Sequence, residues 1–301
     1  MPETATAGKL PEAERFLDLS DYARPLAAWI ARLLRDTPVR APLVTLVWAL
    51  IGLCGAYCYS VGGYAVAVLG AAAMQVKNVL DAVDGSLARL QNRPSRIGRF
   101  MDSILDAVVA AVLYAALSVM LARDRPALYA TGLAGAALVL GLLQGSVYNY
   151  LYVRFRARRG GDTTSRVREA ITPEDEARYG RHPVALSFLR FLIHAYNWIY
   201  GWQDVLVHRV DRWAAEPLLR CGREDLAAAL RDDRRLLTAA SALGPGLLIL
   251  VLNLYTLAGI RQLTLALELF LWTTALGGTF LAAAIFLRLR RAAMRLARQT
   301  E

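Results

Sequence analysis

The feature that most constrains this chain is a set of four aspartates placed between two long apolar runs. Asp81, Asp84, Asp102 and Asp106 follow the run YAVAVLGAAAM and precede the run AVVAAVLYAALSVML. An ionised Asp at membrane depth costs about 2.5–3.5 kcal/mol on insertion scales, so such residues normally face a polar cavity and have a function. A chain that keeps four of them between apolar segments must therefore fold around a polar site.

Helical geometry predicts that these carboxylates lie close together. At about 100° per residue, Asp81 and Asp84 share one half of a helix, and Asp102 and Asp106 share a narrower face of the next helix. Two helices that each present two carboxylates form a cage of oxygen ligands, which suits Mg²⁺ or Mn²⁺. No cluster of Cys or His offers a softer metal site, and we expect no disulfide. The other residues spaced onto the same faces are Gly85, Ala88, Arg89 and Gly98.

Hydropathy predicts the fold class, an all-α polytopic membrane helix bundle. Hydrophobic residues make up 56% of the 301-residue chain, which is too many for a soluble domain. Six apolar segments each have about the 20 residues needed to cross a hydrocarbon core of about 30 Å. These predicted transmembrane helices cover residues 42–60, 64–82, 99–122, 127–153, 236–258 and 262–287.

Two amphipathic segments are expected to lie at the membrane surface without crossing it. Residues 22–34 carry an apolar stripe beside several arginines, which is typical of an interfacial helix, although a helix packed on protein has the same pattern. Residues 184–213 carry one polar stripe on an otherwise apolar helix. We expect that stripe to face water or headgroups; the alternative is that it faces the bundle and helps to bind an acceptor. Its members are Arg190, His194, Asn197, Gly201, Asp204, His208 and Asp211.

The distribution of charge predicts the orientation. The net charge is +10, and the arginines concentrate in the N-terminal segment, the 86–99 loop, residues 154–235 and the tail. The positive-inside rule places these segments, both termini and the aspartates on the cytoplasmic side, in what we expect is a bacterial inner membrane. We expect membrane lipids as partners and no nucleic acid, and we leave a homodimer open. The predicted parts are a cytoplasmic N-terminal segment (1–41), a transmembrane core (42–153), a cytoplasmic or interfacial insertion (154–235), and two last spans with a basic tail (236–301).

The motif D-x2-D-G-x2-A-R-x8-G-x3-D-x3-D, which this chain matches at every fixed position, resembles the signature of the CDP-alcohol phosphotransferase family. The resemblance implies a membrane enzyme with a two-metal site for Mg²⁺ or Mn²⁺. It implies metal ligation by Asp81, Asp84 and Asp102. It also implies that Asp106 is the general base, in a position where it can contact metal. The residues implied to line the CDP site are Gly85, Ala88, Arg89 and Gly98.

Residues beside the motif carry weaker signals. Asn78 lies three positions before the first aspartate of the motif, and we expect it to contact substrate in preference to another helix. Lys77 has two equal interpretations, snorkelling to the interface or contact with a phosphate. Ala41 and Pro42 stand where the family usually has a Pro-Asn pair before a Thr, here Thr45. Any nucleotide contact made by that Asn in relatives must be made differently here.

The reaction implied is transfer of a substituted phosphate group from a CDP-alcohol to an alcohol acceptor, with release of CMP, in phospholipid synthesis. CDP-diacylglycerol is the favoured donor, because SRIGRFMDSILD is similar to the branch that makes inositol-phosphate-type lipids, although that branch often has Arg where this chain has Ala107. LDAVDG is similar to the branch that uses soluble CDP-choline or CDP-ethanolamine with diacylglycerol, which is the alternative. A cation transporter or an inactive scaffold could also keep intramembrane carboxylates, but neither requires Gly, Ala and Arg at fixed offsets.

Overall fold

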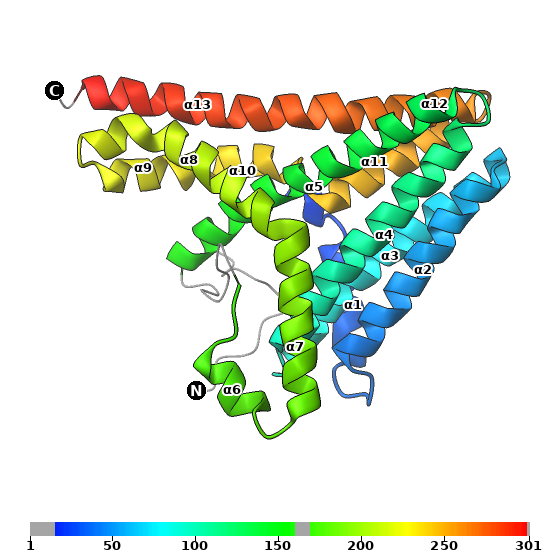
Figure 1. The fold of residues 1–301 in the computed structure, drawn as a ribbon, viewed down its shortest axis with the longest axis horizontal. Coiled ribbons are helices and arrows are strands. Elements are labelled where there is room, and N and C mark those ends of the chain that lie inside the picture. Colours follow the sequence, from blue (N-terminus) through cyan, green and yellow to red (C-terminus); the bar gives the residue numbers. More distant parts are fainter. Residues whose placement is uncertain (1–15, 160–168, 300–301) are drawn as a thin grey trace.

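A computed structural model describes residues 16–159 and 169–299 of the chain. Every regular element within those residues is a helix and none is a strand, which confirms the predicted all-α class. Among the described residues, five helices are long and apolar enough to cross a membrane, and there are six such spans if one bent pair of helices is counted as a single span. Figure 1 shows α2, α3 and α4 side by side, with the last helix running along one edge of the molecule. The chain is therefore an integral membrane helix bundle.

The first four spans agree with the predicted segments, and each helix is longer than its predicted segment. Because α3 continues eight residues past the predicted end and α4 begins three residues early, the aspartate motif lies almost wholly within helices. Ser95 caps the start of α4 by accepting a hydrogen bond from the Gly98 amide at 3.0 Å. The bounds are Ala41–Val61 for α2, Tyr64–Leu90 for α3, Arg96–Leu121 for α4 and Ala127–Arg158 for α5.

The last two spans differ from prediction in their continuity. Residues 236–258 were expected to form one helix, but α10 (Arg234–Ser241) and α11 (Pro245–Ala258) are bent by 46°. The break falls at Pro245, which lacks an amide N–H and whose ring would clash with a carbonyl one turn earlier. Conversely, α12 (Leu263–Trp272), the π-helical η4 (Thr273–Gly278) and α13 (Thr279–Arg298) form one rod that includes most of the predicted tail.

This rod is longer than a bilayer core. It contains 36 residues, which at about 1.5 Å per residue span about 54 Å, against about 30 Å of hydrocarbon. The arginines of the rod begin at Arg288, halfway along α13. The end of α13 therefore projects beyond the hydrocarbon, where α8 (Trp202–Arg220) and α9 (Glu224–Arg231) pack on it through small and apolar side chains.

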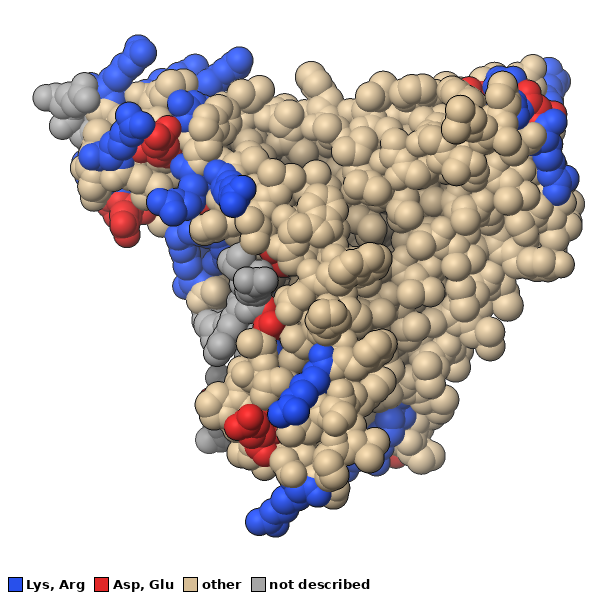
Figure 2. Space-filling model, in the orientation of Figure 1, with Lys and Arg blue, Asp and Glu red and all other residues tan. Residues whose placement is uncertain are grey.

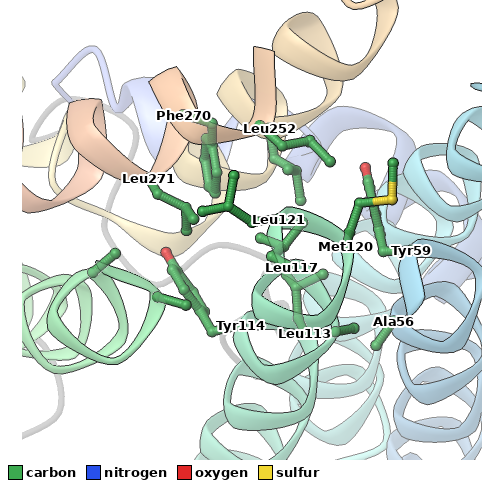
Figure 3. Close-up of a cluster of buried hydrophobic side chains, with 14 of the residues drawn as sticks. Ala56, Tyr59, Leu113, Tyr114, Leu117, Met120, Leu121, Leu252, Phe270 and Leu271 are labelled. Carbon is green, nitrogen blue, oxygen red and sulfur yellow. The ribbon is translucent and has the colours of Figure 1, made fainter. Parts of the chain in front are cut away.

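The core of the bundle fixes the helices that carry the aspartates. Tyr114 and Leu117 of α4 belong to the same buried cluster as Phe270 of α12 (Figure 3). Helices α2 and α3 approach so closely that a Cβ added to Gly70 would lie 2.9 Å from the Gly55 carbonyl oxygen. Bulky substitution at either glycine would push these helices apart and displace the polar site.

The N-terminal segment packs on the bundle as a short amphipathic helix. After the 3₁₀ turn η2 (Leu19–Asp21), α1 (Arg24–Leu34) places Ala27 and Ala31 against α3, and both side chains are fully buried. Part of its apolar stripe faces outward, since Trp29 remains 54% exposed, whereas Ile30 and Leu34 pack on the same core as these alanines. This arrangement fits the predicted interfacial helix. Residues 1–15 of the predicted N-terminal part lie outside the described residues.

A short helix, α6 (Pro173–Tyr179), precedes residues 184–213, for which a single long amphipathic helix was expected. That segment is helical throughout, but the π-helical η3 (Asn197–Gly201) divides it into α7 (Pro183–Tyr196) and α8. None of them is among the candidate spans in the described residues. Residues 160–168 of the predicted insertion lie outside the described residues.

The polar stripe of 184–213 is oriented differently from the prediction at its C-terminal end. Arg190 and His194 are exposed, as expected. Asp211 is fully buried and pairs with Arg231 of α9, so this part of the stripe faces protein and not water. The outer surface carries aromatic side chains, with Trp198 78% exposed. The expectation for Asp211 was wrong because spacing shows which residues share a face, but not what the face contacts.

On the visible face, a broad zone without Lys, Arg, Asp or Glu crosses the molecule. In Figure 2, Lys and Arg gather at the upper right corner and along the left and lower edges, with a broad area of other residues between them. The upper right corner contains the α4–α5 turn, where Arg123 and Arg125 lie. Such a zone is expected of a protein whose middle lies in hydrocarbon.

Candidate metal and substrate site

Three of the four predicted aspartates meet at one point. One carboxylate oxygen from each of Asp81 and Asp84 on α3 and Asp102 on α4 lies within 4.8 Å of the other two. The Oδ1 atom of Asp102 is buried and has no hydrogen-bond partner among the described residues. Buried carboxylate oxygens without donors are costly unless a cation compensates them. The residues present therefore fit a divalent cation with oxygen ligands.

Two side chains from α2 hold Asp84 in place. The Thr45 hydroxyl donates to its Oδ2 at 2.6 Å and the Trp48 indole N–H donates to the same atom at 2.9 Å. Asp84 is only 5% exposed, so these two donors fix its orientation, as outer hydrogen bonds do for metal ligands. Sequence reasoning treated Thr45 only as part of a lead-in and did not identify Trp48. Their spacing of three residues, which places both on one face of α2, was the available signal.

Asp106 lies beside this group and is joined to it through Lys77. The Lys77 ammonium is 2.9 Å from Asp81 Oδ2 and also forms an ion pair with Asp106. Its side chain is 5% exposed, so Lys77 does not snorkel to the interface. Asp106 is not among the three carboxylates that converge within 4.8 Å. The four predicted aspartates are therefore gathered in one polar site, with three at its centre and the fourth next to Lys77. We call these four residues the aspartate site.

The small residues of the motif leave space along α3. A Cβ on Gly85 would meet only the Arg89 side chain, at 3.5 Å, whereas a Cβ on Gly52 of α2 would lie 2.7 Å from Val109. Helix packing thus requires a glycine at Gly52 but not at Gly85. Ala88 and Arg89 are both half-buried on the same helix, and Arg89 donates to the Ser86 hydroxyl at 3.2 Å.

Gly98 has a local structural role in addition to any contact with substrate. An added Cβ there would lie 3.0 Å from the Ser95 hydroxyl that caps the same helix. The start of α4 is thus closely packed against its own cap, one turn before Asp102 of the aspartate site.

Asn78 contacts other helices in the described structure. Its amide donates to the Tyr22 hydroxyl at 3.1 Å, and Tyr22 in turn donates to Gln75 at 2.9 Å. Asn253 of α11 donates to the same Gln75 oxygen at 3.1 Å. This network links the N-terminal segment, α3 and α11, which is the helix–helix alternative considered from sequence. A contact between Asn78 and substrate stays a prediction.

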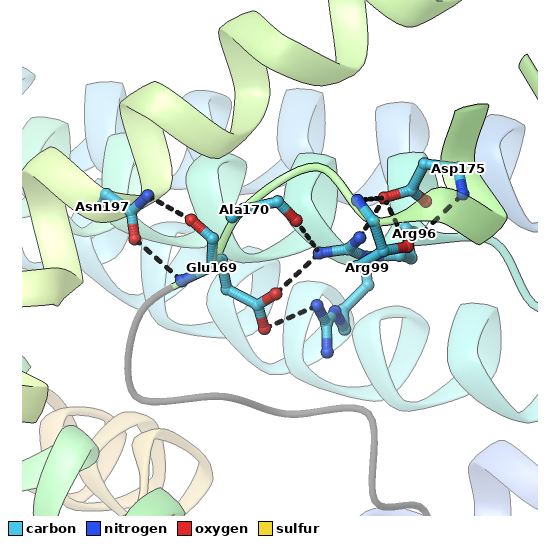
Figure 4. Close-up of polar contacts among 7 residues, drawn as sticks. Arg96, Arg99, Glu169, Ala170, Asp175 and Asn197 are labelled. Atoms are coloured by element: carbon cyan, nitrogen blue, oxygen red, sulfur yellow. Dashed lines mark hydrogen bonds and ion pairs between the residues drawn. The ribbon is translucent and has the colours of Figure 1, made fainter. Parts of the chain in front are cut away.

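A second acidic group lies at the start of α4 and was not predicted. Arg96 and Arg99 bind the two oxygens of Glu169 at 2.7 and 2.8 Å, and Arg96 also pairs with Asp175 (Figure 4). Asn197 donates to the Glu169 carbonyl at 2.8 Å. These contacts hold the segment before α6 across the first turn of α4. We call this group the Glu169 latch.

Comparison with protein-family models assigns the chain to a family. The chain belongs to the CDP-alcohol phosphatidyltransferase family, whose sequence model matches residues 37–210, more than half of its length. No curated protein sequence matches it. The match includes α2 to α7 and the first half of α8, so it contains both the aspartate site and the Glu169 latch.

Membership of this family confirms the resemblance found in the motif. The chain is a membrane transferase of phospholipid synthesis that moves a phosphate-linked alcohol from a CDP-alcohol. The family is typically metal-dependent, and the three converging aspartates can hold a metal ion.

Proposed function

We propose that this protein transfers a phosphatidyl group from CDP-diacylglycerol to an alcohol acceptor and releases CMP. The observation that supports this most is the convergence of Asp81, Asp84 and Asp102 within 4.8 Å between two membrane-spanning helices. A donor with acyl chains can remain in the bilayer while its cytidine diphosphate reaches such a site. The likeness of SRIGRFMDSILD to the inositol-phosphate-type branch supports the same donor.

The three converging aspartates would hold Mg²⁺ or Mn²⁺, which when bound would neutralise the pyrophosphate and stabilise the CMP leaving group. Asp106 takes the proton of the acceptor hydroxyl. The acceptor oxygen bonds to the phosphorus distal to the cytidine, the P–O bond to the proximal phosphate breaks, and CMP leaves with that electron pair. Gly85 and Ala88 let the nucleotide lie against α3. Arg89 pairs with phosphate oxygens through its planar fork of donors.

The assay that tests this proposal uses purified protein with labelled CDP-diacylglycerol or CDP-choline and a panel of alcohol acceptors. We expect CMP release and a lipid product with CDP-diacylglycerol, none in excess EDTA, and recovery with Mg²⁺ or Mn²⁺. Ca²⁺ should serve poorly, because it prefers more ligands and longer bonds. If turnover occurred only with CDP-choline as donor and diacylglycerol as acceptor, the assignment of CDP-diacylglycerol as donor would be wrong. Full activity in EDTA would exclude the metal-dependent mechanism.

We further propose that the aspartate site opens to the cytoplasm of a bacterial cell and that α7 and α8 stay on that side. Cysteines replacing Arg181 and Arg220, which are exposed at either end of the two helices, test this in a background without Cys54, Cys58 and Cys221. An impermeant thiol reagent should label both only after the cytoplasmic face is opened. A cysteine at Asp124, in the α4–α5 turn, should be labelled from outside. Labelling of the first two positions from opposite sides would mean that the chain crosses between them.

A further inference from the structure

A buried ammonium group lies between two carboxylates of the aspartate site. Lys77 Nζ is 2.9 Å from Asp81 Oδ2 on its own helix and bridges to Asp106 on α4. It also lies 4.3 Å from the centre of the Trp48 ring, whose indole N–H holds Asp84. The Lys77 side chain is 5% exposed. One cation is thus fixed by two anions and an aromatic face inside the polar site.

The choice of lysine at this position is unusual for this chain. Of its 35 Lys and Arg residues, only two are lysines, Lys9 and Lys77. An ammonium is a compact point charge with three donors, whereas a guanidinium is a broad planar fork. A position between two carboxylates from facing helices suits a compact cation. The charge of Lys77 is therefore concentrated at one point, as the charge of a metal ion is, whereas an arginine at this position would spread its charge over a plane.

The arrangement of the four carboxylates indicates which position the Lys77 ammonium occupies. Asp81, Asp84 and Asp102 converge on one point, and Asp106 is separate from them and shares Lys77 with Asp81. Two-metal sites place their ions about 3.5–4 Å apart and bridge them with shared ligands. Asp81 takes part in both contacts here, because it is one of the three converging aspartates and its Oδ2 also binds Lys77.

We propose that Lys77 occupies the second cation position of the aspartate site, so that the protein without donor binds one divalent ion and not two. This inference rests on the proposed function, because it assumes that the aspartates bind metal. Lys77 is then a positioning residue: it holds Asp106 at the edge of the metal group and keeps it out of direct coordination.

Counting bound Mn²⁺ tests the inference without any substrate. Free Mn²⁺ is measured by its EPR signal during titration of the purified protein in detergent, in the absence of donor. We expect one tightly bound ion per wild-type chain. Lys77→Met, which shortens the side chain by one atom and removes its charge, should bind two, because Asp81 and Asp106 then share a vacant place. Val76→Met, at a neighbouring position with 47% exposure, is the matched control and should bind one.

A double variant identifies the ligands of the second ion. Lys77→Met combined with Asp106→Asn should return the count to one, because the second place then keeps only one of its two carboxylates, Asp81. Two tightly bound ions in the wild type would overturn the inference even if Lys77→Met failed to fold, and so would a count of one in a folded Lys77→Met protein. A wild-type count of zero would instead remove the metal site on which the proposed function depends. The two failures are therefore distinguishable.

Discussion

Two kinds of buried acidic group occur in this protein, and their counter-charges differ. In the Glu169 latch, the carboxylates of Glu169 and Asp175 are bound by Arg96 and Arg99. Asp211 is likewise matched, because both of its oxygens accept from Arg231 at 2.7 and 2.9 Å. In the aspartate site, the ion pairs among the described residues provide one ammonium for four carboxylates, and this ammonium of Lys77 pairs only with Asp81 and Asp106.

This difference separates structure from function. A buried ion pair with complete hydrogen bonding satisfies its own charges and holds elements together. Like charges gathered without enough counter-ions destabilise the folded chain, so they persist where a ligand supplies the missing charge. Arginine side chains of the protein thus neutralise the carboxylates of the Glu169 latch and of Asp211. The carboxylates of the aspartate site instead require bound cations to neutralise them.

The largest expected effect comes from Asp102→Asn, and it has opposite signs for activity and stability. Removing a metal ligand should lower turnover by about a thousandfold or more, since a bound ion supplies several kcal/mol to the transition state. In EDTA the same change removes one of several crowded charges, and unfolding stability should rise by about 1 kcal/mol. Turnover and thermal unfolding are measured on one preparation. A clear loss of metal-free stability would contradict the view that this site is under-neutralised.

Asp106→Asn should separate proton transfer from donor binding. We expect turnover to fall by about a hundredfold to a thousandfold, the usual range for a general base. Binding of CDP-diacylglycerol should stay nearly unchanged, because the three converging aspartates remain. Donor binding and saturating turnover are measured side by side, with Asp36→Asn, at a side chain 92% exposed, as the control. Near-normal turnover would remove Asp106 from the role of base.

Arg231→Ala, which breaks the ion pair of Asp211, should lower stability and leave turnover nearly unchanged. It leaves the buried Asp211 with Tyr150 at 3.0 Å and Arg154 at 3.2 Å but without its bidentate partner. Breaking a buried pair costs about 3–5 kcal/mol, and we expect the lower end because these contacts remain. Turnover of the folded fraction should be close to that of the wild type, since the change lies outside the aspartate site.

The control for this change is Arg220→Ala. Arg220 pairs with Glu216 one turn away on α8, and its side chain is 77% exposed. Exposed pairs of this kind contribute about 0.3–0.5 kcal/mol. If thermal unfolding showed equal losses for both variants, burial would not be what distinguishes the Asp211 group.

The sequence was sufficient for the aspartate site because its members lie on two consecutive helices. Spacing alone placed Asp81 and Asp84 on one face and Asp102 on the next, and the apolar runs located the first four spans, although α3 extends eight residues past its predicted end. The partner of Lys77 on its own helix, Asp81, was within reach of the same reasoning. The partner on α4, Asp106, depends on how two helices pack, which periodicity does not describe.

The ion pairs of Asp211 and of the Glu169 latch could not be predicted either, because they also depend on how separate helices pack. Asp211 and Arg231 are 20 residues apart on different helices, and Glu169 reaches back about 70 residues to Arg99. A polar stripe shows that its members share a face, but burial of that face depends on tertiary contacts. The break before Pro245 was in principle readable, because proline disrupts a helix interior.

The smallest expected effect concerns Asp204, an acid on α8 that belongs to neither group. Burial raises the pKa of the Asp204 carboxyl to about 7, and the charge of Glu169 adds to this increase. Since the folded protein then holds the proton more tightly than the unfolded chain, the stabilising contribution is fully present below about pH 4 and is lost as pH rises through about 7. Asp204→Asn removes this dependence.

The advantage of Asp204→Asn over the wild type in unfolding stability should therefore grow between pH 5 and pH 8, by about 1 kcal/mol after allowance for solvent screening of a half-buried group. Thermal unfolding in detergent at the two pH values measures it, with Asp36→Asn again as the exposed control. An advantage that shrinks with rising pH would mean that a cation compensates Asp204 in the folded protein. Asp204 would then resemble the Glu169 latch and Asp211, whose carboxylates are neutralised by protein cations. Each of these acidic groups would then fall into one of the two kinds.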